Sequence, residues 1–450
     1  MVGLLYPMVG HRRWAYCPHG VGCIYDDHYA ANWGAGMATR RTVLHNPDYA
    51  LLIVVVSLCV FGLLMVYSAG MSVAGRIGEA STYFFVHQGQ LFLVGLVAMF
   101  IGLRIDYHQW RRWAVPGFAI AIVLLIAVLL FGKVSDTGSR RWLVSTSFQP
   151  SELAKIAVII FVAEWLPRKG DDVRSLGYGL VPFGVLVGFI VALIQLEPDL
   201  GTSSVILLSA ATMFLVAGAD ILQFVVAGGL TGFIIYVAVK SNPYQLARLG
   251  SGGKFWEPCG SGNEHLAQIC QGIIAMGSGG LTGLGLGSSR WRWDLPLPYS
   301  DSILAIIGEE LGLFGTMIVV VLFALLVYRG LRIAFETPDS FGRLMAVGIT
   351  AWLGLQATIN IGGNVALLPF TGVPLPFISF GGSSLVTALF AVGILLNISR
   401  QTQAVGAPAG VSAPLQRIPH APIDYGGRDG GTRLPGSIRR GSLEKGPASR

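Results

Sequence analysis

Asp301 is the residue of this sequence whose position most strongly suggests chemistry. It lies in the segment 295–311, where a long connecting stretch gives way to an apolar one. A carboxylate at such a boundary is partly withdrawn from water, which disfavours its charged form. A group of this kind can accept a proton from a substrate hydroxyl. The other interpretation is structural, because Ser300 or Asp301 could cap the helix that follows.

Charged residues interrupt apolar stretches at two further places. Glu152 and Lys155 follow Pro150 and are three residues apart, so they share one face of a helix and can pair. A self-neutralised pair would be structural, but ionisable residues inside a membrane are functional candidates by default. Asp199 lies in a turn after Pro198 and either caps the next helix or contributes to a site.

A glycine-rich run covers residues 277–289. It has no lysine at the position that a phosphate-binding P-loop requires, so we expect no nucleotide. Two interpretations stay open. The run is either tightly packed backbone on the membrane surface or a row of backbone amides near an anionic headgroup.

Residues 368–384 hold three prolines and three glycines beside apolar residues. Irregular backbone at membrane depth persists only where protein or a wet cavity satisfies its polar groups. The segment therefore predicts a cavity wall near the outer leaflet.

The elements that must position these residues are membrane helices. The chain is 53% hydrophobic and 12% charged, more apolar than a soluble protein of its length can bury. Stretches of about 20 apolar residues suit a bilayer about 30 Å thick. We count ten, and the sequence predicts an all-α polytopic integral membrane protein with spans at 49–70, 84–103, 113–131, 151–166, 180–196, 200–217, 221–239, 302–328, 344–367 and 376–398.

The net charge is +7, and the basic residues lie at membrane edges and in the C-terminal tail rather than in one patch. This distribution argues against nucleic acid as a partner. Basic loops after the second, fourth and eighth spans predict cytoplasmic connections, and ten spans then place both termini in the cytoplasm. The long loop 240–300 between the seventh and eighth spans is then extracytoplasmic. So is the connection that carries Lys133, Arg140 and Arg141, and we expect these cations to bind a ligand.

The predicted domains are a cytoplasmic N-terminal segment 1–45, a transmembrane domain 46–400 and a disordered cytoplasmic tail 401–450 rich in Gly, Pro, Ser and Arg. Met37 opens a basic segment directly before the first span, so we expect translation to start there and residues 1–36 to be an artefact. A disulfide between Cys259 and Cys270 is left open.

Seven motifs in this order resemble the SEDS family of bacterial cell-wall proteins, which includes FtsW, RodA and SpoVE. The resemblance extends over residues 46–400, and the ending 393–400 is more similar to the FtsW and SpoVE branch. The motifs are 140–142, 149–155, 198–202, 268–271, 275–280, 300–312 and 374–384. Leu297, Tyr299 and Ser302 depart from the family pattern, which often has Glu, His and Phe there.

The resemblance implies a peptidoglycan glycosyltransferase that polymerises lipid II into glycan strands at the outer face of the bacterial plasma membrane, in cell division or cell-shape maintenance. It implies Asp301 as the catalytic base. The substrate-binding residues that it implies are Arg140, Arg141, Glu152, Lys155, Asp199, Gln271, Ser379 and Ser383. The alternatives are a lipid II flippase, which intramembrane charges would also suit, and a non-catalytic scaffold in which Asp301 is only a cap.

The family further suggests a divalent cation, Mg²⁺ or Mn²⁺, and no nucleotide. Its expected partners are a class B penicillin-binding transpeptidase and other division or elongation proteins. The residues themselves show neither the cation nor these partners.

Overall fold

Long apolar helices dominate the computed structural model, which describes residues 46–134, 140–143, 149–223, 225, 228–229 and 264–402. The helices are α2 (Tyr49–Arg76), α3 (Tyr83–Arg104), α4 (Tyr107–Phe131), α5 (Pro150–Lys169), α6 (Val181–Leu196), α7 (Leu200–Val216), α10 (Glu264–Gly279), α11 (Ile303–Glu336), α12 (Ser340–Asn364) and α13 (Gly382–Thr402). Short elements connect them: β1 (Lys133–Val134), β2 (Arg140–Trp142), η1 (Gly170–Arg174), η2 (Leu176–Leu180) and η3 (Trp291–Trp293).

In this part of the chain, seven stretches are long and apolar enough to cross a membrane: α2, α3, α4, Leu176–Leu196, α11, α12 and α13. Nine of the ten predicted spans overlap a helix given above, and most of the tenth, 221–239, falls outside the described residues. The class of polytopic helical membrane protein is therefore confirmed. The count of ten spans and the loop at 240–300 stay predictions, although α10 lies within that loop.

Three predicted boundaries were wrong, two of them because charged residues were assigned to loops. The third helix begins at Tyr107 rather than 113, so Arg111 and Arg112 lie within it. The eighth span was predicted to end at 328, whereas α11 continues to Glu336. The last helix begins at Gly382 rather than 376, since the proline-rich residues before it are not helical.

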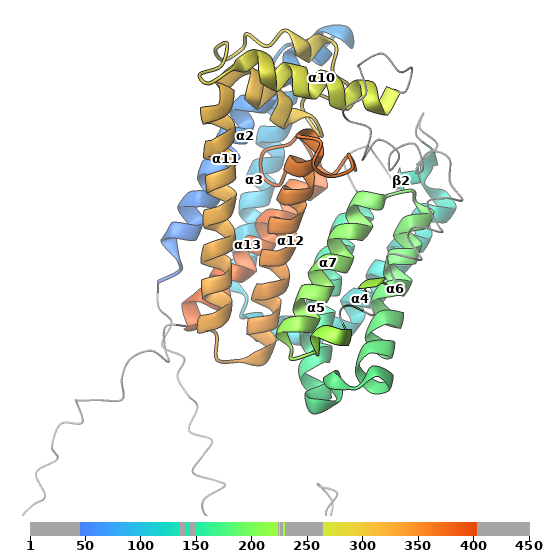
Figure 1. Cartoon of the computed structure of the whole chain (residues 1–450). Coiled ribbons are helices and arrows are strands. Elements are labelled where there is room, and N and C mark those ends of the chain that lie inside the picture. Colours follow the sequence, from blue (N-terminus) through green and yellow to red (C-terminus); the bar gives the residue numbers. More distant parts are fainter. Residues whose placement is uncertain are drawn as a thin grey trace, which may run out of the picture. The chain divides into compact units, whose positions relative to one another are not determined.

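The helices pack as two neighbouring sets joined by α12 (Figure 1). In one set α2 contacts α3 and α11, and α3 packs on α13; in the other, α5 contacts α4 and α7, and α6 contacts α7. The contact of α3 with α13 depends on small residues. A Cβ on Gly393 would lie 2.2 Å from the carbonyl oxygen of Met99, so the two backbones touch there, as small residues allow in membranes.

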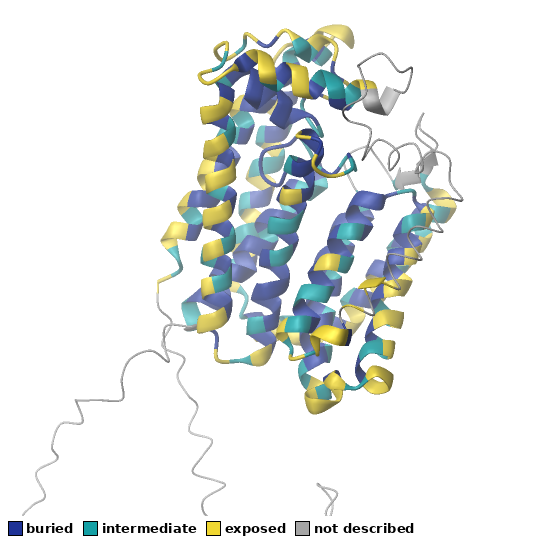
Figure 2. Cartoon of the chain, in the orientation of Figure 1, coloured by how far each residue is buried: buried dark blue, intermediate teal, exposed yellow. Residues whose placement is uncertain are grey.

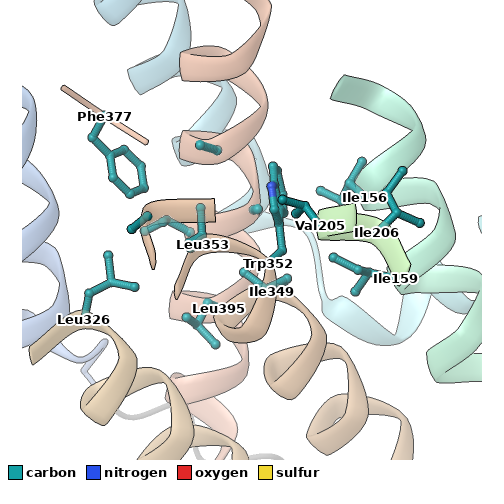
Figure 3. Close-up of a cluster of buried hydrophobic side chains, with 14 of the residues drawn as sticks. Ile156, Ile159, Val205, Ile206, Leu326, Ile349, Trp352, Leu353, Phe377 and Leu395 are labelled. Carbon is teal, nitrogen blue, oxygen red and sulfur yellow. The ribbon is translucent and has the colours of Figure 1, made fainter. Parts of the chain in front are cut away.

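Burial separates inner from outer helices (Figure 2). The apolar windows of α12 and α13 are 72% buried, whereas that of α3 is 17% buried. In Figure 3, Trp352 of α12 faces Ile156 and Ile159 of α5 and Val205 and Ile206 of α7. The centre is therefore a packed apolar core, and the exposed apolar side chains of the outer helices suit contact with lipid tails.

Candidate functional site

Asp301 lies in a turn directly before α11, and its backbone is held by two asparagines of α12. The carbonyl oxygen of Asp301 accepts hydrogen bonds from Asn360 Nδ2 at 3.1 Å and Asn364 Nδ2 at 3.0 Å. The N-cap position of α11 is Ser302, rather than Ser300 or Asp301, which the alternative structural interpretation had placed there. Two amide side chains on a buried helix thus fix the main chain at Asp301.

The irregular segment before α13 holds the same turn from another side. Ser379 Oγ donates to the carbonyl of Ser300 at 2.8 Å and accepts from the amide of Leu375 at 2.8 Å. The amide of Phe380 donates to the carbonyl of Tyr299 at 2.9 Å. Ser379 is therefore a residue that shapes the turn, and the broken backbone finds its hydrogen bonds within the protein.

The Asp301 side chain is half-buried and accepts a hydrogen bond from Ser300 Oγ at 2.9 Å. Beside it, the Tyr299 ring stacks on Phe84 with centroids 4.3 Å apart and meets Phe380 edge-on. Burial, with a smaller contribution from the neighbouring Asp301 carboxyl group, raises the pKa of Tyr299. The Tyr299 phenol is thus neutral at neutral pH.

The predicted pair on α5 is confirmed. Lys155 Nζ lies 2.8 Å from Glu152 Oε2, and both side chains are almost fully buried. Lys155 Nζ also donates to Gln356 Oε1 at 2.8 Å and lies 5.0 Å from the centre of the Trp352 ring. The ammonium is therefore bound by a carboxylate, an amide and an aromatic face.

Helix α12 links this pair to the Asp301 turn through Gln356, Asn360 and Asn364, which recur every four residues on one face. Gln356 Nε2 donates to the carbonyl of Pro374 at 2.9 Å, and Asn360 Nδ2 donates to that of Val373 at 2.7 Å. Eight residues of helix rise about 12 Å. The sequence analysis missed these residues, and their recurrence inside an apolar span was the signal that could have found them.

Asp199 caps α7, which is the first of the two interpretations offered by the sequence. Its carboxylate accepts from the amide of Thr202 at 3.0 Å, from Thr202 Oγ1 at 2.9 Å and from Gln149 Nε2 at 3.2 Å. The backbone amide of Gln149 donates to Ser383 Oγ at 3.2 Å. Asp199, the start of α5 and Ser383 are thus brought together by hydrogen bonds.

The remaining predicted residues are placed less fully. Arg140 lies in β2, where it pairs with Val134 of β1, and Arg141 is its neighbour in that strand; the described residues do not include their side chains. Gln271 is half-buried on α10. Its neighbour Cys270 is disulfide-bonded, and Cys259, whose pairing with Cys270 the sequence left open, lies outside the described residues.

The glycine-rich run is packed into a break in α11. Gly312 has φ 65° and ψ −161°, a conformation that glycine adopts far more readily than other residues. A helix would join the amides of Leu313 and Phe314 to the carbonyls of Glu309 and Glu310. Instead these amides donate to Gly280 and Leu281 at 2.9 and 3.2 Å, and the two carbonyls accept from residues 284 and 285 at 3.0 and 2.9 Å. The run is tightly packed backbone that completes the helix.

Comparison with known proteins agrees with this arrangement. The family model described as "Cell cycle protein", named for FtsW, RodA and SpoVE, matches residues 49–404. The chain is 42% identical over 375 residues to "Stage V sporulation protein E" of Bacillus subtilis (strain 168), covering 82% of this chain and 100% of that protein. It is 40% identical over 373 residues to "Probable peptidoglycan glycosyltransferase FtsW" of Geobacter metallireducens, covering 81% and 97%.

Two solved structures share the fold. The rod shape determining protein RodA of Thermus thermophilus superposes with a TM-score of 0.58 at 25% identity, covering 79% of this chain and 97% of that one. A chain from the structure described as "Structural coordination of polymerization and crosslinking by a peptidoglycan synthase complex" gives a TM-score of 0.64 at 24% identity, covering 79% and 98%.

The chain therefore belongs to the FtsW, RodA and SpoVE family of multi-pass membrane proteins. Its identity to SpoVE and FtsW exceeds that to this RodA, which agrees with the branch indicated by residues 393–400.

Proposed function

We propose that this protein is a peptidoglycan glycosyltransferase that polymerises lipid II at the outer face of the bacterial plasma membrane, with both termini in the cytoplasm. One observation carries the proposal. Asp301 is a half-buried carboxylate whose turn is fixed by Asn360, Asn364, Ser379 and Phe380, in a chain whose relatives include proteins named as probable peptidoglycan glycosyltransferases.

The reaction needs a base and a stabilised leaving group. The 4-hydroxyl of one lipid II sugar attacks the anomeric carbon of another, a new glycosidic bond forms, and the bond to the lipid diphosphate breaks. Asp301 takes the hydroxyl proton, a contribution of about 10²–10⁴-fold for a positioned base. Arg140 and Arg141 are proposed to bind the departing diphosphate, since guanidinium groups make bidentate contacts with phosphate.

Other residues act as binding or cavity residues in this proposal. Glu152 and Lys155 form a buried polar wall, Asp199 fixes the start of α7 beside Ser383, and Ser379 shapes the Asp301 turn. Gln271 on α10 is assigned to substrate binding by the family resemblance alone.

A divalent ion, Mg²⁺ or Mn²⁺, fits the proposal only together with substrate. Among the described residues, no group of three or more His, Cys, Asp or Glu side chains could hold a metal ion. Mg²⁺ is commonly bound by one or two carboxylates with phosphate oxygens completing its shell. Asp301 has the right donor type, and a bound ion would neutralise charge on the diphosphate.

A class B penicillin-binding transpeptidase is the proposed partner, together with other division or elongation proteins. A related chain occurs in a complex that polymerises and crosslinks peptidoglycan, which supports this choice. The proposed domain limits are 1–45, 46–400 and 401–450.

The test is polymerisation of purified lipid II by the protein with its cognate transpeptidase in detergent. No membrane separates two compartments there, so a lipid II flippase yields no product. Glycan strands from the purified pair support the proposal. Their absence from a folded, partnered protein contradicts it and favours the flippase, which the buried Glu152–Lys155 pair would also suit.

A further inference from the structure

Two neighbouring carboxylates of α11, Glu309 and Glu310, are fully buried. In the part of the chain that the structure describes, neither forms an ion pair. Burying an ionised carboxylate is costly unless hydrogen bonds replace its water. These two side chains must therefore obtain that compensation from donors that are not charged.

The donors come from the segment that follows the glycine-rich run. Glu309 accepts from Ser289 Oγ at 2.5 Å and from the amide of Arg290 at 2.9 Å. Glu310 accepts from the amide of Ser289 at 3.3 Å. The amide of Trp291 also donates to Glu309, at 3.4 Å. The two carboxyl groups therefore hold residues 289–291 onto α11 through one hydroxyl and three backbone amides.

Helix α2 holds the adjoining residues from the opposite side. Ser68 Oγ donates to both oxygens of Glu310, at 2.6 and 2.8 Å. Four residues on, Ser72 Oγ donates to the carbonyl of Arg292 at 2.8 Å, and after four more the Arg76 guanidinium donates to the carbonyl of Trp293. Because these positions share one helix face, α2 presents a row of donors to Glu310 and to the carbonyls of Arg292 and Trp293.

These contacts lie on both sides of Asp301 in the sequence, at residues 289–293 before it and at Glu310 after it. Residues 294–300 begin where the contacts with α2 end. Glu310 follows Asp301 by nine residues, and it lies about 10 Å of helix beyond the start of α11 at Ile303. We propose that Glu310 is a positioning residue for Asp301, acting through Ser68 and Ser289. The carboxylate joins α2, the outer loop and the first half of α11 into one unit, and it thereby sets where Asp301 meets substrate. The inference rests on the proposed function.

The expected effect lies in the rate of the chemical step. A displacement of about 1 Å can lower a rate by about 10²-fold. Glu310→Ala removes the acceptor and should lower kcat at least about tenfold, with KM within about twofold, because Glu310 is buried away from substrate. Glu310→Gln keeps one oxygen for Ser68 and Ser289, and should restore kcat to within about threefold of wild type.

The experiment measures lipid II polymerisation and amide hydrogen exchange for Glu310→Ala, Glu310→Gln, Ser68→Ala and the double variant Ser68→Ala/Glu310→Ala. Glu336→Gln serves as the matched control, because it changes a half-exposed glutamate on the same helix. Ser68→Ala is the milder variant if Glu310→Ala folds poorly, with an expected threefold loss of kcat. The double variant should be no slower than Glu310→Ala, since both changes break one linkage.

Faster exchange of amides 284–291 in Glu310→Ala, with α12 unchanged, supports the anchoring even if the wild type yields no product, an outcome that contradicts only the proposed function. Three results would each overturn the inference. The first is a wild-type kcat in folded Glu310→Ala, and the second is a double variant whose loss of kcat equals the product of the two single losses. The third is amide exchange at 284–291 that Glu310→Ala leaves unchanged.

Discussion

The start of α5 and the first half of α11 both bury carboxylates, but they compensate the charge differently. On α5, Glu152 pairs with Lys155 at 2.8 Å, and the two side chains neutralise each other within one helix turn. On α11, Glu309 and Glu310 are bound by hydroxyls and backbone amides from other parts of the chain. The first is a local ion pair, and the second is an anion site filled by the protein's own side chains.

The difference shows what each region depends on. On α5 the carboxylate depends on its neighbour on the same helix, so loss of Lys155 leaves Glu152 buried without its cation. The α11 carboxylates need residues 289–291 in place, and those residues need the carboxylates. The comparison therefore predicts large local effects on α5, and effects on α11 that are shared with residues 289–291 and with α2.

Breaking the α5 pair should have the largest effect on stability. Lys155→Met leaves Glu152 buried without its cation, which should cost about 3–5 kcal/mol. Thermal unfolding in detergent measures the loss. Glu152→Gln/Lys155→Met removes both charges and should recover much of it. A single variant as stable as wild type would show that the pair is not needed.

Changing Gly312 should have an intermediate effect on the α11 region. A Cβ there would lie 2.5 Å from the amide nitrogen of Gly283 and from the carbonyl oxygen of Leu281, and φ is positive. Gly312→Ala should therefore cost about 1–3 kcal/mol and loosen the glycine-rich run in hydrogen exchange. Gly117→Ala on α4, where a Cβ meets nothing within 4 Å, is the matched control and should be neutral or stabilising. Equal effects of the two changes would argue against the packed break.

Neutralising Glu309 should have the smallest effect of the three. Glu309→Gln keeps an oxygen that accepts from Arg290, so we expect a loss of about 1 kcal/mol, the scale of one hydrogen bond. The same thermal unfolding assay checks it. A loss as large as that of Lys155→Met would mean that the negative charge, rather than the acceptor geometry, holds residues 289–291.

These two regions also differ in how many of their contacts could be predicted from the sequence. The Glu152–Lys155 pair was predicted because a spacing of three residues is local information. Ser68 lies 242 residues from Glu310, and no periodicity relates such distant positions. Asn360 and Asn364 carry a local signal, but their acceptor at Asp301 is set only by tertiary packing.

Hydropathy predicted the positions of the helices well, but it did not predict where they begin and end. The ends depended on Arg111, Arg112 and the residues after 328, where the charged side chains lie on helices that extend beyond the apolar stretch. Proline at 374 and 376 marked irregular backbone correctly, yet the apolar residues around it moved the predicted start of the last helix to 376.

The central claim is that Asp301 is the base of lipid II polymerisation, and one comparison tests it most directly. Purified wild type, Asp301→Asn and Asp294→Asn are assayed with the cognate transpeptidase in detergent. Asp294 is the matched control because it is an exposed aspartate seven residues before Asp301. We predict glycan strands from wild type and Asp294→Asn, and none from a folded Asp301→Asn. Strand synthesis by Asp301→Asn at the wild-type rate would contradict the assignment.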